Sequence, residues 1–302
     1  MNNFPGRAPP RRVEPIRVQE GATMIKLARE LVEPVMVAAF EGWNDAGEAA
    51  SLAVEHLSNQ WDAYELCALT PDDYYDFQVT RPRMTVVDGL VSEVEWPTTR
   101  VRVASPPEVD HDVVLVTGPE PNLRWRSYIA DLMAIARELG VKRVVMLGSL
   151  LADAPHTRPI PVTGMASPVE LGTRHGLDPT TYSGPTGIVG VAHKMFSSVG
   201  LETVSLWAAI PHYVAQPPCP KATLALLAWL EDFLDVRVPL GELPDEAVSW
   251  ESNVDELTAE DEEISSYVRG LEEAKDTAEL PEASGDAIAE EFERYLRRRD
   301  DN

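Results

Sequence analysis

The chain has 302 residues, with 26 lysines and arginines against 50 aspartates and glutamates, so its formal net charge at pH 7 is −24. Hydrophobic residues make up 44% of the sequence, which is enough for a buried core and excludes a globally disordered chain. The acidity excludes nucleic acids and anionic membrane surfaces as partners, because both require a basic footprint on the protein.

The two cysteines, Cys67 and Cys219, are too few for a disulfide scaffold or a four-thiolate zinc site. Such sparse use of cysteine indicates a reducing, cytoplasmic setting. The N-terminal residues include arginines but lack the apolar run of a secretory signal, and no stretch of about 18 apolar residues occurs anywhere. We therefore expect neither secretion nor a membrane span.

Composition divides the sequence into three regions. Residues 1–20 contain four prolines and four arginines without hydrophobic periodicity, which predicts a disordered arm. Residues 21–241 carry the strand and helix patterns of an α/β core. Residues 242–302 contain 21 acidic and 6 basic residues, a net charge of −15, and are predicted to form an acidic helical extension.

In the core, near-continuous apolar runs predict buried strands, and segments of helical periodicity follow most of them. The predicted strands cover residues 34–40, 64–69, 101–103, 113–118, 144–148 and 203–210. The predicted helices cover residues 45–57, 123–139, 187–199 and 222–234. This alternation predicts an α/β fold with a mostly parallel sheet flanked by helices on both faces.

One segment interrupts the alternation. Residues 84–96 have β-rich flanks on either side of Asp88-Gly89, a dipeptide typical of a tight hairpin turn. A hairpin inserted before the strand at 101–103 would project from the sheet. It would either extend the sheet or make a subunit contact, and the local pattern is compatible with both.

The acidic extension carries two apolar stripes at helical spacing. The first consists of Ile264, Tyr267, Val268 and Leu271, and the second of Ile288, Phe292, Tyr295 and Leu296. Thr258 with Asp261 fits a capping box ahead of the first stripe. We expect two helices between residues 257 and 298 to fold back over the core as a lid near the ligand crevice, with a partner protein as the alternative destination.

Polar and glycine-rich loops follow the predicted strands, at the edge where an open α/β sheet binds its ligands. The candidate ligand-binding residues in these loops are Glu41, Asn44, Asp45, Gly118, His156, Arg158, Gly184, Thr186, Gly187 and His212. Carboxylates, a histidine and an arginine that converge on one crevice can bind an anion or transfer a proton. Residues 184–187, directly before a predicted helix, also offer free backbone N–H groups to an anion.

Structural roles compete for the same residues. Asp45 is placed to cap the helix that follows, with Glu48 in the capping-box position, and we favour this role over catalysis. His156 and Arg158 lie in a proline-rich loop that they would tie down, and His212 is equally explained as a structural histidine. Glu41 follows a buried strand directly and therefore needs a hydrogen-bond partner.

Cofactor motifs are missing from the sequence. It contains no G-x-x-x-x-G-K-[ST] or G-x-G-x-x-G phosphate-binding loop, no G-x-S-x-G nucleophile elbow and no H-E-x-x-H zinc motif. The six histidines also lack the spacing of metal ligands. We therefore assign no cofactor, no metal and no catalytic residue.

At these loops the sequence resembles the PAC2 family, which is named after proteasome assembly chaperone 2. The resemblance covers roughly residues 35–234 and rests on the segments Phe40–Gly47, Leu147–Leu151, Pro155–Pro159, Tyr182–Ile188 and Pro211–Tyr213, with Pro217 and Pro220 after the last. The sequence is most similar to the bacterial branch, which adds a helical C-terminal region. The resemblance implies a core similar to that of purine nucleoside phosphorylases and a homotrimer. It also implies a role in proteasome assembly among eukaryotic and archaeal members.

Two classes of function follow. The favoured one is a non-enzymatic assembly chaperone or protein-interaction protein. The alternative is a small-molecule-binding enzyme of hydrolase or phosphorylase type, which rests on analogy of fold. Chaperones of this type often end in a hydrophobic-Tyr-any tripeptide, whereas this chain ends Asp300-Asp301-Asn302, which argues against proteasome docking by that route. We expect the hairpin to lie at the subunit contact of the trimer, because an isolated hairpin needs packing.

Overall fold

The computed structural model describes residues 16–18, 29–107, 109–177, 182–214 and 216–279. Among these residues, eight strands form a mixed sheet in the order β1-β3-β6-β7-β2-β8-β10-β9. The strands are β1 Ile16–Val18, β2 Val35–Glu41, β3 Tyr64–Leu69, β6 Arg100–Ala104, β7 Val113–Pro119, β8 Arg143–Ala152, β9 Val162–Ser167 and β10 Glu202–Pro211. Six of these described strands run in one direction, and β6 and β9 run against them.

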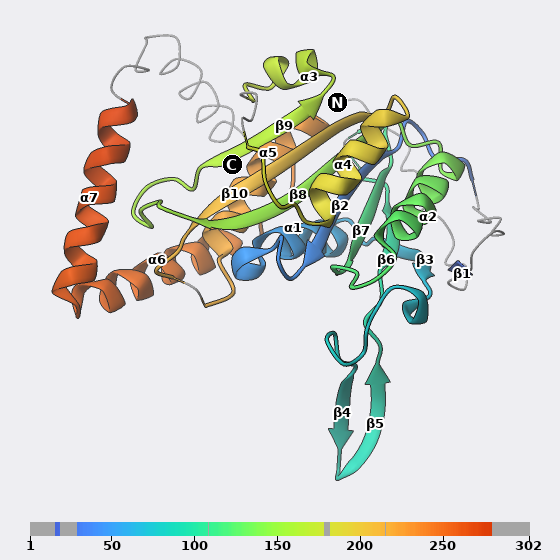
Figure 1. The fold of residues 1–302 in the computed structure, drawn as a ribbon, viewed down its shortest axis with the longest axis horizontal. Coiled ribbons are helices and arrows are strands. Elements are labelled where there is room, and N and C mark those ends of the chain that lie inside the picture. The colour runs from blue at the N-terminus through green and yellow to red at the C-terminus, as the bar shows by residue number, and fades with distance from the viewer. Residues whose placement is uncertain (1–15, 19–28, 108, 178–181, 215, 280–302) are drawn as a thin grey trace, which may run out of the picture.

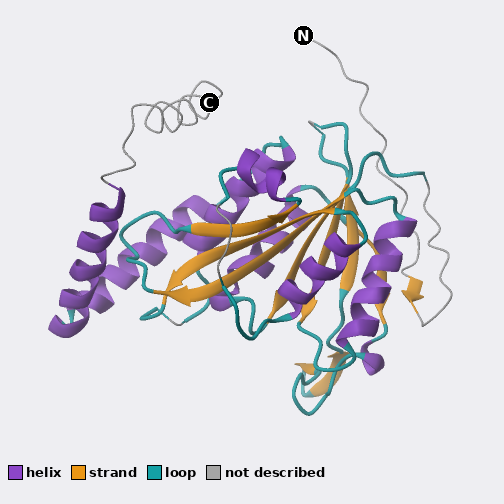
Figure 2. Cartoon of the chain, turned by 45° about the horizontal axis from the view of Figure 1, so that its top comes forward, coloured by secondary structure: helices purple, strands orange, loops and turns teal. Residues whose placement is uncertain are grey.

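Helices cover both faces of the sheet (Figures 1 and 2). They are α1 Ala49–Gln60, α2 Trp125–Glu138, α3 Val169–Arg174, α4 Ile188–Ser198, α5 Pro220–Leu234, α6 Leu243–Ala259 and α7 Glu262–Glu279. Helices α1 and α5 bury their apolar faces in one core, and α2 and α4 bury theirs in a second core on the opposite face. None of the helices in the described ranges is both long and apolar enough to cross a lipid bilayer.

Strand β2 shows why the central strands are continuous apolar runs. Val35, Val37 and Ala39 contribute to the core shared with α1 and α5. Met36 and Phe40 contribute to the core shared with α2 and α4. Because successive side chains alternate between the faces of a sheet, a strand covered on both sides has no position left for a polar residue.

The predicted α/β fold is confirmed, and every strand and helix predicted for the core is present within a few residues. Two strands of the sheet and one short α-helix beside it were not predicted. Strand β1 lies in the arm expected to be disordered and pairs in parallel with β3. Strand β9 is an edge strand without an apolar run, and α3 follows it as a helix of six residues. Elements this short, or this exposed, leave no clear hydrophobic period in a sequence.

The predicted hairpin is formed by β4 Arg83–Val87 and β5 Leu90–Glu95, which pair in antiparallel orientation. Asp88 and Gly89 have φ angles of 52° and 78°, as a two-residue turn with two left-handed positions requires. The hairpin is a separate two-stranded sheet that projects away from the body (Figure 1). The interpretation as an extension of the main sheet is therefore wrong.

The described part of the acidic extension is two helices, α6 and α7. Helix α6 was not predicted, although Ala247, Trp250 and Val254 are spaced at i, i+3 and i+7 and are buried against the core. The predicted capping box is replaced by Asp261 alone, whose carboxylate accepts the backbone N–H of Glu263 at 2.8 Å. The predicted second stripe, at residues 288–296, lies outside the described residues.

Candidate functional site

The structure divides the predicted site residues into two groups. Glu41, Asn44 and Gly118 lie at the ends of β2 and β7, whereas His156 and Arg158 follow β8. Strand β8 pairs with β2 as far as Leu147 and then continues for five residues beside β10. At about 3.3 Å per residue this extra length carries the second group roughly 16 Å further, toward α6 and α7 (Figure 1). The two groups were expected to share one crevice because all the strands were assumed to end at the same edge of the sheet.

Asn44 joins β2 to the start of α4. Its side chain is fully buried, and its Nδ2 donates a hydrogen bond of 2.7 Å to Oε1 of Glu120. The same Oε1 accepts the backbone N–H of Ile188, the first residue of α4, at 2.7 Å. Glu120 therefore occupies the helix N-terminus that the sequence analysis assigned to an external anion. Glu120 was absent from the predicted site, although a carboxylate directly after β7 matches Glu41 after β2.

Close packing explains two of the predicted glycines. A Cβ atom at Gly187 would lie 2.1 Å from Oδ1 of Asn44, so a side chain there would displace the buried amide. A Cβ atom at Gly118 would lie 2.7 Å from the backbone oxygen of Thr98. Gly184 is exposed, and Thr186 makes a hydrogen bond of 3.5 Å to the carbonyl of Gly187. In the described residues these contacts are internal to the fold.

Asp45 caps the helix that follows it, as favoured. Its Oδ1 accepts the backbone N–H of Ala50 at 2.7 Å and lies 3.3 Å from Oγ of Ser149. Burial raises the pKa of Asp45, and these hydrogen bonds oppose that shift. Glu48 does not complete a capping box, since the backbone N–H of Asp45 donates to the carbonyl of Gly42 at 3.0 Å.

A cavity of about 630 Å³ lies between the base of the hairpin and the ends of β2, β6 and β7, and we call it the hairpin-base cavity. Its volume falls in the range of roughly 300–1,000 Å³ usual for ligand pockets. Its charged and aromatic lining residues are Glu41, Glu55, Glu95, Glu120, Arg81, Arg83, Arg100, Arg102, Trp43 and Trp96. Of the predicted site residues, Glu41 and Gly118 line it.

The four arginines of the hairpin-base cavity differ in their partners. Arg100 forms an ion pair of 3.1 Å with Glu65, and Arg102 forms one of 2.7 Å with Glu55. The side chains of Arg81 and Arg83 form neither a hydrogen bond nor an ion pair with any residue that the structure describes, although the charge of Arg83 acts on Glu41. The cavity therefore offers two guanidinium groups whose N–H donors are not used by other side chains of the described residues.

Glu41 faces this cavity at the end of β2. Loss of water around the carboxylate raises its pKa, the nearby charge of Arg83 opposes the shift, and Asp45 adds to it. No side-chain hydrogen bond to Glu41 is formed within the described residues. Glu41 is exposed, so solvent can supply the hydrogen-bond partner that was expected from the protein.

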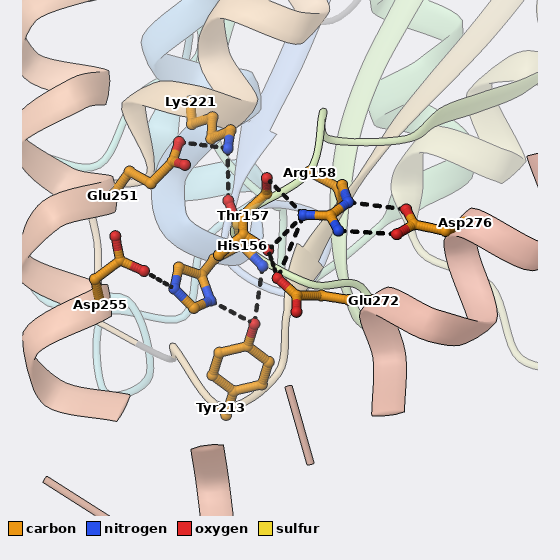
Figure 3. Close-up of polar contacts among 9 residues, drawn as sticks. All are labelled: His156, Thr157, Arg158, Tyr213, Lys221, Glu251, Asp255, Glu272 and Asp276. Atoms are coloured by element: carbon orange, nitrogen blue, oxygen red, sulfur yellow. Dashed lines mark hydrogen bonds and ion pairs between the residues drawn. The ribbon is translucent and has the colours of Figure 1, made fainter. Parts of the chain in front are cut away.

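His156 belongs to a different environment, against α6 (Figure 3). Its side chain is 1% exposed, its Nδ1 lies 2.8 Å from the hydroxyl of Tyr213, and its Nε2 lies 3.0 Å from Oδ1 of Asp255. The Tyr213 hydroxyl also accepts the backbone N–H of His156 at 2.8 Å. Both ring nitrogens of His156 are thus held, one by Tyr213 and the other by Asp255 of α6. Burial raises the pKa of Tyr213 to about 12.

Arg158 binds α7 through its whole guanidinium group (Figure 3). Nε and Nη2 each donate to one carboxylate oxygen of Asp276 at 2.9 Å, and Nη1 lies 3.3 Å from Glu272. On α5, Nζ of Lys221 lies 2.5 Å from both Glu251 of α6 and the backbone oxygen of His156. The loop after β8 is thus the docking seat of the extension, which matches the structural role considered for His156 and Arg158.

His212 lies at the rim of this docking seat. Its Nδ1 is 3.4 Å from Oδ1 of Asp153, and its ring is 5.4 Å from that of Tyr267 on α7. Helices α6 and α7 contribute no lining residue to the hairpin-base cavity. The described extension therefore packs over the second group of predicted site residues and away from Glu41. Within the part of the chain that the structure describes, no three His, Cys, Asp or Glu side chains are arranged to hold a metal ion.

The protein is therefore an α/β protein with a mixed sheet that helices cover on both faces. A projecting hairpin and two C-terminal helices are added to this sheet. The chain belongs to the PAC2 family, whose sequence model matches residues 39–258. No curated protein matches the sequence.

Solved structures agree with this assignment. A PAC2 family protein from Streptomyces avermitilis is 54% identical, with 78% of this chain and 99% of that chain covered and a TM-score of 0.73. A proteasome-assembly chaperone homologue from Mycobacterium tuberculosis is 50% identical, with the same coverage and TM-score. An archaeal proteasome activator from Pyrococcus furiosus is 16% identical, covers 76% of this chain and 95% of its own, and shares the fold at a TM-score of 0.61.

Proposed function

We propose that this protein acts by binding other proteins, as a non-enzymatic assembly chaperone or interaction protein, with the hairpin as its main contact element. The observation that carries this proposal is the apolar surface of the hairpin. Its exposed apolar residues, with fractional exposures of 45–74%, are Met84, Val86, Val87, Leu90, Val91 and Val94. A two-stranded hairpin is marginally stable alone, and an apolar surface of this kind is typical of an interaction site.

The relatives support a proteasome-related partner. One structure that is half identical to this chain is described as a proteasome-assembly chaperone homologue. The fold is also that of an archaeal proteasome activator. On this basis, the partner class that we propose is a subunit of a multi-subunit protein assembly. The buried free thiols of Cys67 and Cys219 are compatible with the cytoplasm, which we propose as the compartment.

The hairpin also supports self-association. We propose a homotrimer in which each hairpin packs against a neighbouring copy, because this removes the apolar side chains of β4 and β5 from water. Burial of a large apolar side chain is worth roughly 1.5–3 kcal/mol, so a few such residues can hold an interface. The same side chains would be available to a different protein partner when the assembly opens.

The test combines oligomeric mass with partner binding. Light scattering at micromolar concentration should give a trimer mass for the natural chain and a smaller mass for the double variant Leu90→Ser, Val91→Ser. Val248→Ser, which removes an equally exposed apolar side chain from α6, should leave the mass unchanged. Binding of purified proteasome subunits should weaken in the hairpin variant alone. The proposal would be refuted if the natural chain were a monomer and did not bind these subunits.

One observation favours the second candidate, a small-molecule-binding enzyme. Glu41 has a raised pKa and lies in a cavity at the carboxyl edge of the strands, where a proton-transferring carboxylate is commonly found. Native mass spectrometry of the purified chain would detect a retained metabolite. Conversion of that metabolite by the natural chain and its loss in Glu41→Gln would establish the enzyme, and would displace the interaction protein as the main function.

A further inference from the structure

We propose that the hairpin-base cavity binds the carboxylate of a peptide-like ligand that carries an apolar side chain, with Arg81 and Arg83 as the anion-binding pair. This inference rests on the proposed role in protein binding and deepens it, because it names the chemistry of the segment that a partner would present. It does not follow from the hairpin surface, since the cavity lies at the base of the hairpin and its lining is mainly polar.

The charge of the ligand follows from the arginines. Arg100 is paired with Glu65 and Glu95 and Arg102 with Glu55, whereas the side chains of Arg81 and Arg83 make no hydrogen bond or ion pair among the described residues. A guanidinium group presents a fork of N–H donors that matches a carboxylate with two parallel hydrogen bonds. Two guanidinium groups without a side-chain hydrogen bond, in the wall of one cavity of a chain with a net charge of −24, offer their donors to an anion.

The kind of anion follows from the carboxylates that share the wall. Four glutamates, Glu41, Glu55, Glu95 and Glu120, line the cavity beside its four arginines, so the wall has no excess positive charge to hold a doubly charged phosphate, and a singly charged carboxylate fits it better. Glu41 has no side-chain hydrogen-bond donor from the described residues, and Arg83 acts on it through its charge without a direct ion pair. A ligand that presents an N–H group close to its carboxylate satisfies Glu41 and the arginines together. Amide N–H beside carboxylate is the chemistry of a peptide end.

The apolar requirement follows from two tryptophans. The side chains of Trp43 and Trp96 are 66% and 48% exposed and both line the cavity. The Trp96 ring is held edge-on against Phe77 with the ring centroids 4.8 Å apart. Large aromatic surfaces beside a charged pair are typical of sites that bind an apolar side chain and its neighbouring polar group. A volume of about 630 Å³ exceeds what a bare carboxylate fills.

The cavity is also linked to the hairpin. Arg83 and Glu95, which line the cavity, are directly opposite each other at the first residue pair of the hairpin. A ligand held by Arg83 therefore contacts the base of the hairpin, while the apolar tip stays free. The same partner can place its terminal residues in the cavity and a second surface on the hairpin.

Fluorine NMR on the full chain labelled with 5-fluorotryptophan gives a direct test, with resonances assigned through Trp43→Phe and Trp96→Phe. Four probes are titrated: N-acetyl-leucine, N-acetyl-leucinamide, the acetylated tetrapeptide Ala-Ala-Ala-Leu with a free carboxylate, and inorganic phosphate. N-acetyl-leucine and the tetrapeptide should shift both tryptophan resonances. The double variant Arg81→Gln, Arg83→Gln should weaken this binding by about tenfold or more, since it removes both charge-assisted pairs. Arg126→Gln, an exposed arginine on α2, should bind as the natural chain does.

The probes also separate the two sources of the carboxylate. A tetrapeptide that binds about tenfold more tightly than N-acetyl-leucine, a gain of about 1.4 kcal/mol, would identify a polypeptide end. Equal affinity would identify a small free carboxylate. Equal binding of the amide, tighter binding of phosphate, or no shift with any probe would overturn the proposal. Leu90→Ser with Val91→Ser should abolish assembly without changing these titrations, so that failure of the cavity and failure of the hairpin are told apart.

Discussion

The amide of Asn44 donates a 2.7 Å hydrogen bond to Glu120, and the same carboxylate oxygen receives the first backbone N–H of α4. The side chain of Glu120, in the loop after β7, thus connects the loop after β2 to the start of α4. An anion at a helix N-terminus is stabilised by the free N–H groups and by the helix dipole. In this protein the anion is part of the chain.

Replacement of Glu120 by alanine should therefore destabilise the fold. The change leaves the buried amide of Asn44 and the N–H of Ile188 without their acceptor, and each such loss costs about 1–3 kcal/mol. We expect a loss of about 2–4 kcal/mol in the free energy of unfolding, measured with urea. Glu170→Ala, an exposed carboxylate on α3, should change it by less than about 0.5 kcal/mol. Equal effects of the two variants would contradict this role.

Two glycine-to-alanine changes should have opposite signs. Gly187→Ala forces a methyl group against the side chain of Asn44 and should cost about 1–3 kcal/mol, as overpacking of a buried site does. Gly270→Ala lies on α7 with no atom within 4 Å of the new methyl group, and should stabilise that helix by up to about 1 kcal/mol. Thermal unfolding of the two variants under one condition checks the pair.

The docking of α7 should depend on Arg158. The guanidinium group holds the pKa of Asp276 below its usual range, so this contact contributes above the unfolded pKa of about 3.9 and is lost as the pH falls through the lower, folded value. Hydrogen exchange of residues 262–279 should become faster in Arg158→Gln and at high salt, while Arg126→Gln leaves it unchanged. Unaltered protection in Arg158→Gln would show that apolar contacts alone hold α7.

His193 should make the stability of the fold depend on pH. It is buried on α4 between Ser205, 2.8 Å from Nδ1, and Ser167, 3.1 Å from Nε2, and burial lowers its pKa to about 4. The unfolded chain, with a histidine pKa of about 6.5, binds the extra proton first as the pH falls. The stabilisation from neutral His193 is complete above about pH 6.5 and is lost between there and pH 4, by roughly 3 kcal/mol. Urea unfolding across this range should show the slope, and His193→Asn should flatten it.

Both cysteines should be inert in the folded chain. Burial raises the pKa of Cys67 to about 12 and that of Cys219 to about 11, so neither is a thiolate at neutral pH. A thiol-specific reagent should label neither residue under native conditions and both residues in denaturant. Rapid labelling of the native chain would mean that one of the two cores opens readily.

Local sequence patterns were sufficient for the layout of the core. The apolar run of β2 predicted a strand covered on both faces, and Asp88-Gly89 predicted a two-residue turn. Both could be predicted because burial and backbone angles restrict the residue types at adjacent positions. The cap at Asp45 was predictable for the same reason, since its acceptor lies only five residues before the N–H of Ala50.

The division of the site was decided by tertiary structure alone. Asn44 and Glu120 are 76 residues apart, and Arg158 and Asp276 are 118 residues apart, so neither pair leaves a local signal. The sequence placed His156 and Glu41 at the same edge of the sheet, but the length of β8 separated them and placed His156 under α6. The role of a polar side chain depends on the group that it contacts. That group is known only when the lengths of the strands and the positions of the helices are known.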